Sequence, residues 1–341
     1  MIVMAYFGRN DITLTVQVPF LCDNECGFCN IKDLYKGINL DPKESLVNIK
    51  KTVKEVIDKT YGVTGICFSG GEPFISKESI DWLKEMIDFV VSEHWNRRGN
   101  TKFNIYINTH LPLNTGMAVQ DFVENYNSVI RGISISRHTK DEKDDNFIFN
   151  NKVCSDKFIT DLAIEYPKRF RINCVCNYIG SAIFAYNRWS GYDKAINKGY
   201  LKLNLREDYT KTTANDLHTL TIDQVKKYYF LEPKNEGGCN VCNAFSTKFD
   251  FVTIHKGLEY THLKTEEYET EINDLIVIPD GTLLYEWDLR GDFDHLITPL
   301  EEVALMSEKF YEDQIKSHMD GSSNFYSRCR RWRGRRWSTT R

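Results

Sequence analysis

The sequence contains no apolar run long enough to cross a membrane as a helix, which needs about 20 residues. The first residues carry no basic segment and no small-residue cleavage site, so they do not predict a signal peptide. These absences favour a cytoplasmic protein with no membrane partner. Disulfides are rare in that compartment, so the ten cysteines call for another explanation. For the isolated Cys67 and Cys154 we expect packing in a core.

Acidic residues are absent from residues 328–341, which hold seven arginines. Without these arginines the formal net charge would fall from −4 to −11, so the body of the chain is not a broad nucleic-acid-binding surface. Nucleic acid is expected to bind only through the basic tail at residues 322–341, where arginine and tryptophan are mixed. A disordered end and a partner-docking segment are the other interpretations of this tail.

Six stretches with strand character alternate with amphipathic helical stretches. The strands are expected at residues 12–19, 64–68, 103–107, 129–135, 169–177 and 200–205. Helices are expected after the caps Asp41 and Ser76 and at about residues 116–127, 153–166 and 188–198. The alternation predicts a parallel sheet with right-handed crossovers. Six units are too few for a closed eight-unit barrel, so the expected fold class is α/β, a partial (β/α)6 barrel of the TIM type.

The expected barrel domain spans residues 12–208 and follows a short N-terminal segment at 1–11. Residues 209–321 are expected to form a small α+β extension, because the polar stretch after Asp208 marks a change in character. The Pro-Asp-Gly sequence at residues 279–281 predicts a β-hairpin turn, and residues 250–263 also have strand character. The basic tail completes the division at residues 322–341.

Polar motifs follow the first four expected strands at their carboxyl ends. They are the cysteine-rich residues 22–29, the Gly-Gly-Glu-Pro of residues 70–73, the Asn108-Thr109 pair and the Ser136-Arg137 pair. The carboxyl ends of parallel strands meet at one edge, where the chemistry of such folds is found. The motifs therefore predict one site.

Cys22, Cys26 and Cys29 form a C-x3-C-x2-C motif. A structural zinc site needs four ligands, and no fourth cysteine or histidine lies nearby. Three thiolates suit a 4Fe–4S cluster in which one iron stays open. A zinc site and three cysteines packed in a core loop are the alternatives.

This motif on the loop after the first strand, with Phe28 just before its third cysteine and Gly-Gly-Glu-Pro after the second strand, resembles the radical S-adenosylmethionine (SAM) enzymes. The resemblance covers residues 12–207, and the chain is loosely similar to the molybdopterin-precursor cyclase and auxiliary-cluster branch. It implies that Cys22, Cys26 and Cys29 bind a 4Fe–4S cluster whose open iron binds SAM. It further implies reductive cleavage of SAM to a 5′-deoxyadenosyl radical that abstracts hydrogen from a substrate. An electron donor such as flavodoxin or ferredoxin is the implied partner.

The resemblance also implies which residues contact SAM. Phe28 would lie by the adenine, and Gly70, Gly71 and Glu72 would present backbone groups to the methionine amino group.

Four strand-end residues are further candidates for contact with SAM. Asn108 and Thr109 follow the third strand, Ser136 stands where the family often places a ribose-binding side chain, and Arg137 suits the SAM carboxylate. For each, the alternative is a polar residue that meets solvent.

A second C-x2-C motif joins Cys239 and Cys242, and His262 stands where the cyclase type has a third cysteine. The interpretations are an auxiliary iron–sulfur cluster that includes His262, a zinc site with His255 or His262, and unliganded cysteines. The terminal Gly-Gly of the cyclase type is also missing, so that specific activity is not predicted.

The function expected is that of a radical SAM enzyme acting on a small molecule or nucleotide-derived precursor. A peptide- or protein-modifying maturase or activating enzyme is the alternative. The non-enzymatic rival is an iron–sulfur or zinc-binding regulatory protein. The Gly-Gly-Glu-Pro motif argues against that rival, because cluster binding alone needs no site for the SAM amino group.

Overall fold

The computed structural model describes residues 4–7, 12–24, 26, 29, 31, 35, 38, 41–59, 63–98, 103–176, 179–196, 198–207, 244–246, 252–255, 263–264, 269–272 and 275–284. Six neighbouring parallel strands form the centre of its main sheet. They are β2 (Ile12–Gln17), β3 (Val63–Ser69), β4 (Asn104–Thr109), β5 (Ile130–Ser136), β6 (Phe170–Cys176) and β7 (Leu201–Glu207). The six predicted strands are thus confirmed, each within a few residues of its expected bounds.

Four more strands extend this sheet to ten, in the order β13-β12-β2-β3-β4-β5-β6-β7-β9-β8. At one edge β12 (Leu275–Val277) runs parallel to β2 and pairs antiparallel with β13 (Leu283–Leu284). At the other edge β9 (Val252–His255) runs parallel to β7 and pairs antiparallel with β8 (Ala244–Ser246). The two edges do not pair, so the barrel is partial, as predicted.

The β12–β13 hairpin confirms the predicted Pro-Asp-Gly turn. Gly281 has a φ of 89°, and its N–H donates to the carbonyl of Ile278 at 2.9 Å. A second sheet joins β1 (Met4–Phe7), β11 (Glu269–Ile272) and β10 (Leu263–Lys264), although the sequence analysis assigned no strand to residues 1–11. The division of the chain into domains stays a prediction.

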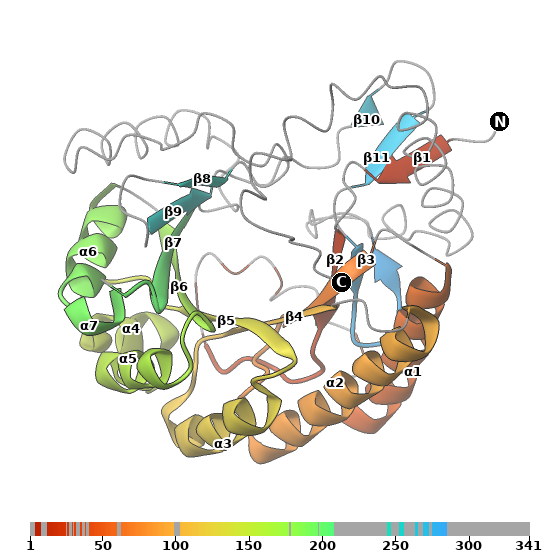
Figure 1. The fold of residues 1–341 in the computed structure, drawn as a ribbon, viewed down its shortest axis with the longest axis horizontal. Coiled ribbons are helices and arrows are strands. Elements are labelled where there is room, and N and C mark those ends of the chain that lie inside the picture. The colour runs from red at the N-terminus through yellow and green to blue at the C-terminus, as the bar shows by residue number, and fades with distance from the viewer. Residues whose placement is uncertain are drawn as a thin grey trace, which may run out of the picture.

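Helices lie on the outer side of the curved sheet (Figure 1). They are α1 (Pro42–Lys59), α2 (Lys77–Arg98), α3 (Gly116–Tyr126), α4 (Glu142–Phe149), α5 (Asp156–Glu165), α6 (Ile179–Ser190) and α7 (Asp193–Ile196), with a short 3-10 turn η1 (Leu113–Thr115) before α3. Both predicted caps are present. The carboxylate of Asp41 accepts from the N–H of Lys43 at 2.8 Å, and Ser76 Oγ accepts from the N–H of Ser79 at 3.1 Å.

The helix predicted at residues 188–198 was misplaced. The chain forms α6 from Ile179 and breaks after Ser190, and the four-residue α7 follows. The cause is burial, because Ala182, Ala185 and Trp189 all face the core. Packing of these side chains makes the helix begin at an earlier residue than the local sequence indicates.

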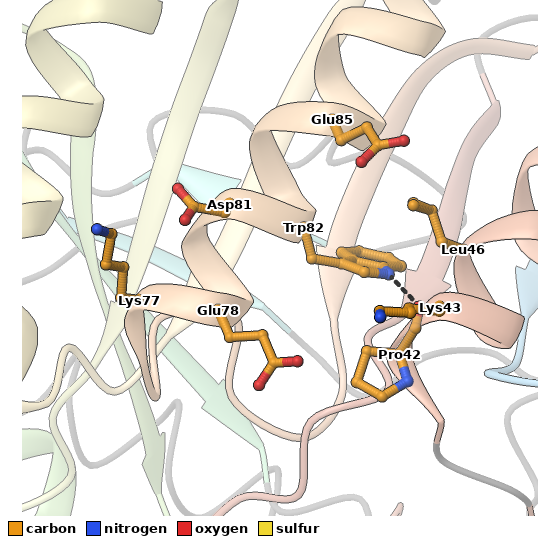
Figure 2. Close-up of a pocket in the computed structure, with 8 residues that line it drawn as sticks. All are labelled: Pro42, Lys43, Leu46, Lys77, Glu78, Asp81, Trp82 and Glu85. Carbon is orange, nitrogen blue, oxygen red and sulfur yellow. Dashed lines mark hydrogen bonds between the residues drawn. The ribbon is translucent and has the colours of Figure 1, made fainter.

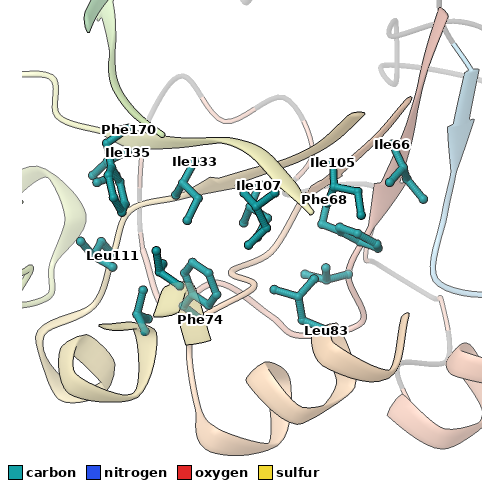
Figure 3. Close-up of a cluster of buried hydrophobic side chains, with 14 of the residues drawn as sticks. Ile66, Phe68, Phe74, Leu83, Ile105, Ile107, Leu111, Ile133, Ile135 and Phe170 are labelled. Carbon is teal, nitrogen blue, oxygen red and sulfur yellow. The ribbon is translucent and has the colours of Figure 1, made fainter. Parts of the chain in front are cut away.

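The hydrophobic core fills the space between the sheet and the helices. Alternate residues of β3, β4 and β5 point into it, as Figure 3 shows for Ile66, Ile107 and Ile135 beside Phe74 and Leu83. Alternation is the period of a strand, so the remaining residues of these strands lie on the opposite, concave face of the sheet. Cys154 belongs to this core, as predicted, and Cys174 and Cys176 of β6 join it.

The concave face is polar. Its residues include Gln17, Cys67, Ser69, Tyr106, Asn108, Ser134, Ser136, Arg171, Asn173, Asn204 and Arg206, which alternate with the core residues of β2–β7. The prediction that Cys67 packs in the core was therefore wrong. Its neighbours Ile66 and Phe68 take the core positions, and the Asn108 amide donates to the Cys67 sulfur at 3.3 Å. Within the part of the chain that the structure describes, no helix is long and apolar enough to span a bilayer.

Candidate functional site at the carboxyl ends of β2 to β5

The loop that follows β2 carries the three cysteines of the C-x3-C-x2-C motif. Cys22 and Cys26 are half-buried and Cys29 is exposed. The N–H of Cys29 donates to the carbonyl of Cys26 at 3.1 Å, which closes a turn between the last two thiols. Phe28, predicted to lie by an adenine, falls outside the described residues.

Tyr35 is buried on the inner side of this loop. Its hydroxyl donates to the carbonyl of Val18 at 2.9 Å. Burial raises the pKa of Tyr35, and the charges of Cys29 and Cys22 raise it further. Burial also raises the pKa of Cys22.

The Gly-Gly turn after β3 packs directly against the start of the cysteine loop. Gly70 and Gly71 have φ values of 68° and 42°, a region that favours glycine. A Cβ on Gly70 would lie 1.6 Å from Oε1 of Gln17, and a Cβ on Gly71 would lie 1.7 Å from the carbonyl oxygen of Phe20. The N–H of Glu72 donates to that same carbonyl at 3.1 Å. The two motifs predicted to share a site therefore meet.

The carboxylate of Glu72 is buried and is surrounded by donors from the chain itself. It accepts from the N–H of Phe74 at 2.9 Å, from the N–H of His110 at 2.8 Å and from the hydroxyl of Thr109 at 2.5 Å, and Nδ1 of His110 lies 2.5 Å away. Burial alone raises the pKa of Glu72, but the charge of His110 and these hydrogen bonds outweigh it and lower the pKa. Glu72 thus ties the end of β3 to the end of β4.

His110 is a site residue that the sequence analysis did not single out. Its Nε2 is buried, accepts or donates no hydrogen bond among the described residues, and lies 3.8 Å from a carboxylate oxygen of Asp23. The ligand atoms of His110, Asp23 and Cys22 lie within 4.8 Å of one another. The sequence signal that could have identified His110 was its place directly after Asn108 and Thr109 at a strand end.

The other candidates at the strand ends lie at the same edge of the sheet. The Asn108 amide donates to Oγ of Ser69 at 3.2 Å, so it spans β4 and β3. Thr109 Oγ1 donates to Glu72 and accepts from the N–H of Leu111 at 2.7 Å. The hydroxyl of Ser136 has no hydrogen-bond partner among the residues that the structure describes. Each predicted contact with SAM at these positions stays a prediction.

Arg137 is fully buried, and its donors are used inside the protein. Nη1 donates to the carbonyls of His110 and Ser136 at 2.6 Å, and Nη2 donates to the carbonyl of Cys154 at 2.8 Å. Burial lowers its pKa to about 10, although nearby Asp145 acts in the opposite direction. The guanidinium therefore holds the segment after β4 in place, and its predicted pairing with a SAM carboxylate stays a prediction.

Cys239, Cys242 and His262, the predicted auxiliary site, lie outside the described residues. A pocket of about 440 Å³ lies elsewhere, on the convex side of the barrel between α1 and α2. There the indole of Trp82 donates to the carbonyl of Pro42 at 3.1 Å, with Lys43 and Glu78 at the rim (Figure 2). It contains none of the strand-end motifs.

No protein-family model matches the sequence. The probable GTP 3′,8-cyclase of Thermoplasma volcanium is 30% identical over 91 residues, which are 26% of this chain and 26% of that protein. SuiB of Streptococcus suis, solved with its precursor peptide SuiA, matches with a TM-score of 0.50 and 14% identity over 83% of this chain and 61% of SuiB. A structure of SuiB bound to S-adenosylmethionine matches with a TM-score of 0.49 and 14% identity over 81% of this chain and 59% of SuiB.

The chain thus spans less than two thirds of the length of each of these relatives. The match to the cyclase covers about a quarter of each protein, and the likeness to SuiB, at 14% identity, shows a shared fold.

The groups at this edge fit the two ligands that are typical of a radical SAM site. Oε1 of Gln17 is buried against Gly70 and has no donor among the described residues, so it suits an ammonium group such as that of SAM. The three thiols on one loop suit iron, as their spacing predicts.

Proposed function

We propose that this chain is a radical SAM enzyme in which Cys22, Cys26 and Cys29 hold a 4Fe–4S cluster and the Gly70-Gly71 turn holds the amino end of SAM. The supporting observation is that the Gly-Gly turn lies against the start of the cysteine loop, beside the unpartnered oxygen of Gln17. When bound, the cluster and SAM supply a carbon-centred radical that can take a hydrogen atom from a substrate.

The chain's own residues bind and orient in this proposal. Gln17 accepts a hydrogen bond from the ammonium group, and the glycines let the backbone approach it closely. Asn108 and Ser136 are the proposed direct contacts to the rest of SAM, because their side chains lie at the same edge. Thr109 and Arg137 act through the groups that they fix, since both side chains already donate within the protein.

Tyr35 and Glu72 position the site from below. The phenol of Tyr35 is buried between the cysteine loop and the Gly-Gly turn, where a Cβ on Gly70 would lie 2.5 Å from its oxygen. Glu72 fixes the turn relative to β4. Both residues exclude water from the inner side of the loop, and Phe28 is proposed to cover the adenine. The electron is proposed to come from a donor such as flavodoxin or ferredoxin.

The test is cleavage of SAM by anaerobically reconstituted protein reduced with dithionite. We expect 5′-deoxyadenosine and methionine from the wild-type chain and neither from the triple variant with Cys22, Cys26 and Cys29 replaced by alanine. Cys154→Ala is the matched control, because the Cys154 side chain lies in the core and the substitution keeps the carbonyl that Arg137 contacts, so the products should be unchanged. Fully loaded wild-type protein that gives no product would refute the proposal.

The regulatory alternative predicts a different pattern from the same preparation. A metal-binding regulator would hold iron or zinc at the three thiols without cleaving SAM. Peptide modification remains an alternative for the substrate, and the SuiB match shows only the fold. An auxiliary cluster or zinc at Cys239, Cys242 and His262 also stays a proposal, and iron counting on the triple variant would detect the cluster.

A further inference from the structure

Two arginines lie on the concave face of the sheet, away from the strand-end motifs. Arg171 stands near the start of β6 and reaches across β5 to β4, where its guanidinium carbon lies 5.5 Å from the centre of the Tyr106 ring. The route passes over Gly132 of β5, where a Cβ would lie only 2.8 Å from Nη2 of Arg171. The missing side chain at Gly132 therefore makes room for this guanidinium.

Arg206 stands on the neighbouring strand β7, four residues beyond the residue that pairs with Arg171. Its Nε is buried and has no hydrogen-bond partner among the described residues. Between the two arginines lie Asn173 and Asn204, which are paired in register and joined by a hydrogen bond of 3.0 Å from Nδ2 of Asn204 to Oδ1 of Asn173. These four side chains belong to one face of two adjacent strands.

Arg171 and Arg206 stand at concave-face positions of adjacent strands, so both side chains leave the sheet on the same side. Arg206 on β7 and Arg171 on β6 both lower the pKa of Cys67 on β3, although burial raises it overall to about 12. Strands β7 and β3 are separated by three others, or roughly 19 Å along the sheet at about 4.8 Å per step. An effect of both arginines on Cys67 fits side chains that extend from β6 and β7 over the concave face.

Neither arginine is paired with a carboxylate in the described part of the chain. This contrasts with Arg188, whose buried side chain donates to Asp145 at 2.6 Å and to Asp156 at 2.6 Å. Each positive charge of the concave pair instead opposes the other, and Arg206 lowers the pKa of Arg171 in addition to the larger effect of burial. A buried guanidinium group without a counter-charge is costly, and a bound anion lowers that cost for Arg171 and for the buried Nε of Arg206.

We propose that Arg171 and Arg206 form an oxyanion-binding site inside the partial barrel, and that the substrate carries a phosphate or carboxylate group that binds there. The assignment of this anion to a substrate rests on the proposed radical SAM function. A guanidinium presents a fork of N–H donors that matches the paired oxygens of either group. Tyr106 holds the Arg171 fork against its ring, and the Asn173–Asn204 pair offers further amide groups on the same face.

The experiment measures thermal unfolding of the full chain without reconstitution, with inorganic phosphate or succinate added against chloride of equal ionic strength. We expect at least one of these anions to raise the Tm of the wild type by about 2 °C or more, as a ligand near ten times its Kd would. Arg171→Met and Arg206→Met should lose this rise. Their ligand-free Tm should not fall, because each removes one of two opposed charges and keeps an apolar stem.

Arg131→Met is the matched control. Arg131 is exposed at the start of β5 and is close enough to affect the charge of Arg171, so its loss changes the local field without touching the site. We expect the anion-dependent rise to persist in this variant. A response to phosphate alone would identify a phosphorylated substrate, and a response to succinate alone would identify a carboxylate.

Several outcomes would overturn the proposal. They are a wild type that responds to neither anion, a response retained in both methionine variants, and a response lost equally in Arg131→Met. If a methionine variant does not fold, Arg171→Lys and Arg206→Lys keep the charge but lose the fork. If both lysine variants then show the same anion-dependent rise in Tm as the wild type, the result counts against the site.

SAM itself carries a carboxylate, so SAM binding to reconstituted protein is measured in the same variants. Unchanged SAM binding supports a separate substrate site, whereas its loss in both methionine variants would assign the arginines to SAM and overturn the proposal. The two proposals fail separately. A chain that cleaves no SAM refutes the enzyme function, whereas the anion response of the unreconstituted protein does not depend on the cluster.

Discussion

Replacement of Glu72 by alanine should destabilise the protein strongly, even in the absence of any ligand. The substitution leaves the buried N–H groups of Phe74 and His110 without an acceptor and removes the partner of the Thr109 hydroxyl. A buried donor left unsatisfied costs about 1–3 kcal/mol, and a buried charge pair broken on one side costs about 3–5 kcal/mol. Because these losses overlap, we expect Glu72→Ala to lower the free energy of unfolding by about 3–5 kcal/mol.

The assay is urea unfolding of the unreconstituted protein, followed by circular dichroism. Glu78→Ala is the matched control, since Glu78 is exposed in the first turn of α2 and its loss should cost about 0.5 kcal/mol. Glu72→Gln keeps the shape and one acceptor oxygen, so we expect a smaller loss of about 2 kcal/mol. If Glu72→Ala costs no more than Glu78→Ala, the carboxylate does not hold β3 to β4.

The same network predicts the pH dependence of stability. The pKa of Glu72 is lowered from its ordinary value of 4.5, because the charge of His110 and the hydrogen bonds outweigh the opposing effect of burial. A lowered folded-state pKa gives stability that is present above the unfolded-state value and lost as the pH falls through the folded-state value. The difference in stability between the wild type and Glu72→Gln should therefore shrink below pH 4.5. A difference that grows on acidification would contradict this assignment.

Three further predictions concern the packing around the site and the second cysteine pair. Gly71→Ala should lower the free energy of unfolding in urea by at least about 3 kcal/mol, because a Cβ would lie 1.7 Å from a backbone oxygen. The control Gly199→Ala should cost about 1 kcal/mol, since Gly199 also has a positive φ but a Cβ there would have no atom within 4 Å. Equal costs would refute the close approach at Gly71. Arg188→Met should lower the free energy of unfolding by about 3–5 kcal/mol, because it leaves the carboxylates of Asp145 and Asp156 without this partner. The control Lys157→Met, at an exposed ion pair, should change it by about 0.5 kcal/mol or less. A small effect at Arg188 would show that this buried network adds no stability. Iron analysis of the triple cysteine variant should find about four atoms per chain if Cys239 and Cys242 hold an auxiliary cluster, and no iron would remove that cluster from the account.

Local features of the sequence predicted the frame of the site. The caps Asp41 and Ser76 and the alternation along β3 to β6 are decided by neighbouring residues, so the strand ends and their motifs could be placed in advance. The meeting of the cysteine loop with the Gly-Gly turn follows from that order, because β2 and β3 are adjacent and parallel.

Other features depend on contacts that are distant in the sequence. Two partners of the Glu72 carboxylate, Thr109 and His110, come 37 and 38 residues later, so the motif alone gave no indication that its carboxylate is satisfied internally. Arg137 is enclosed by groups of the segment around α4, a helix that the sequence analysis did not predict. The start of α6 at Ile179 was missed because Gly180 and Ser181 are weak helix formers, and burial of Ala182, Ala185 and Trp189 overrides them.

The central claim is that three thiolates of residues 22–29 hold a cluster with one iron left open for SAM. Electron paramagnetic resonance of the reduced, reconstituted protein tests it most directly. Spectra are recorded for the protein alone, with SAM added, and with methionine added. To isolate this cluster, the measurement uses chain in which Cys239 and Cys242 are replaced by alanine. We expect SAM to change the g values of the paramagnetic resonance signal of the 4Fe–4S cluster. A signal that is unchanged by saturating SAM would mean that no iron is open to it and would contradict the account.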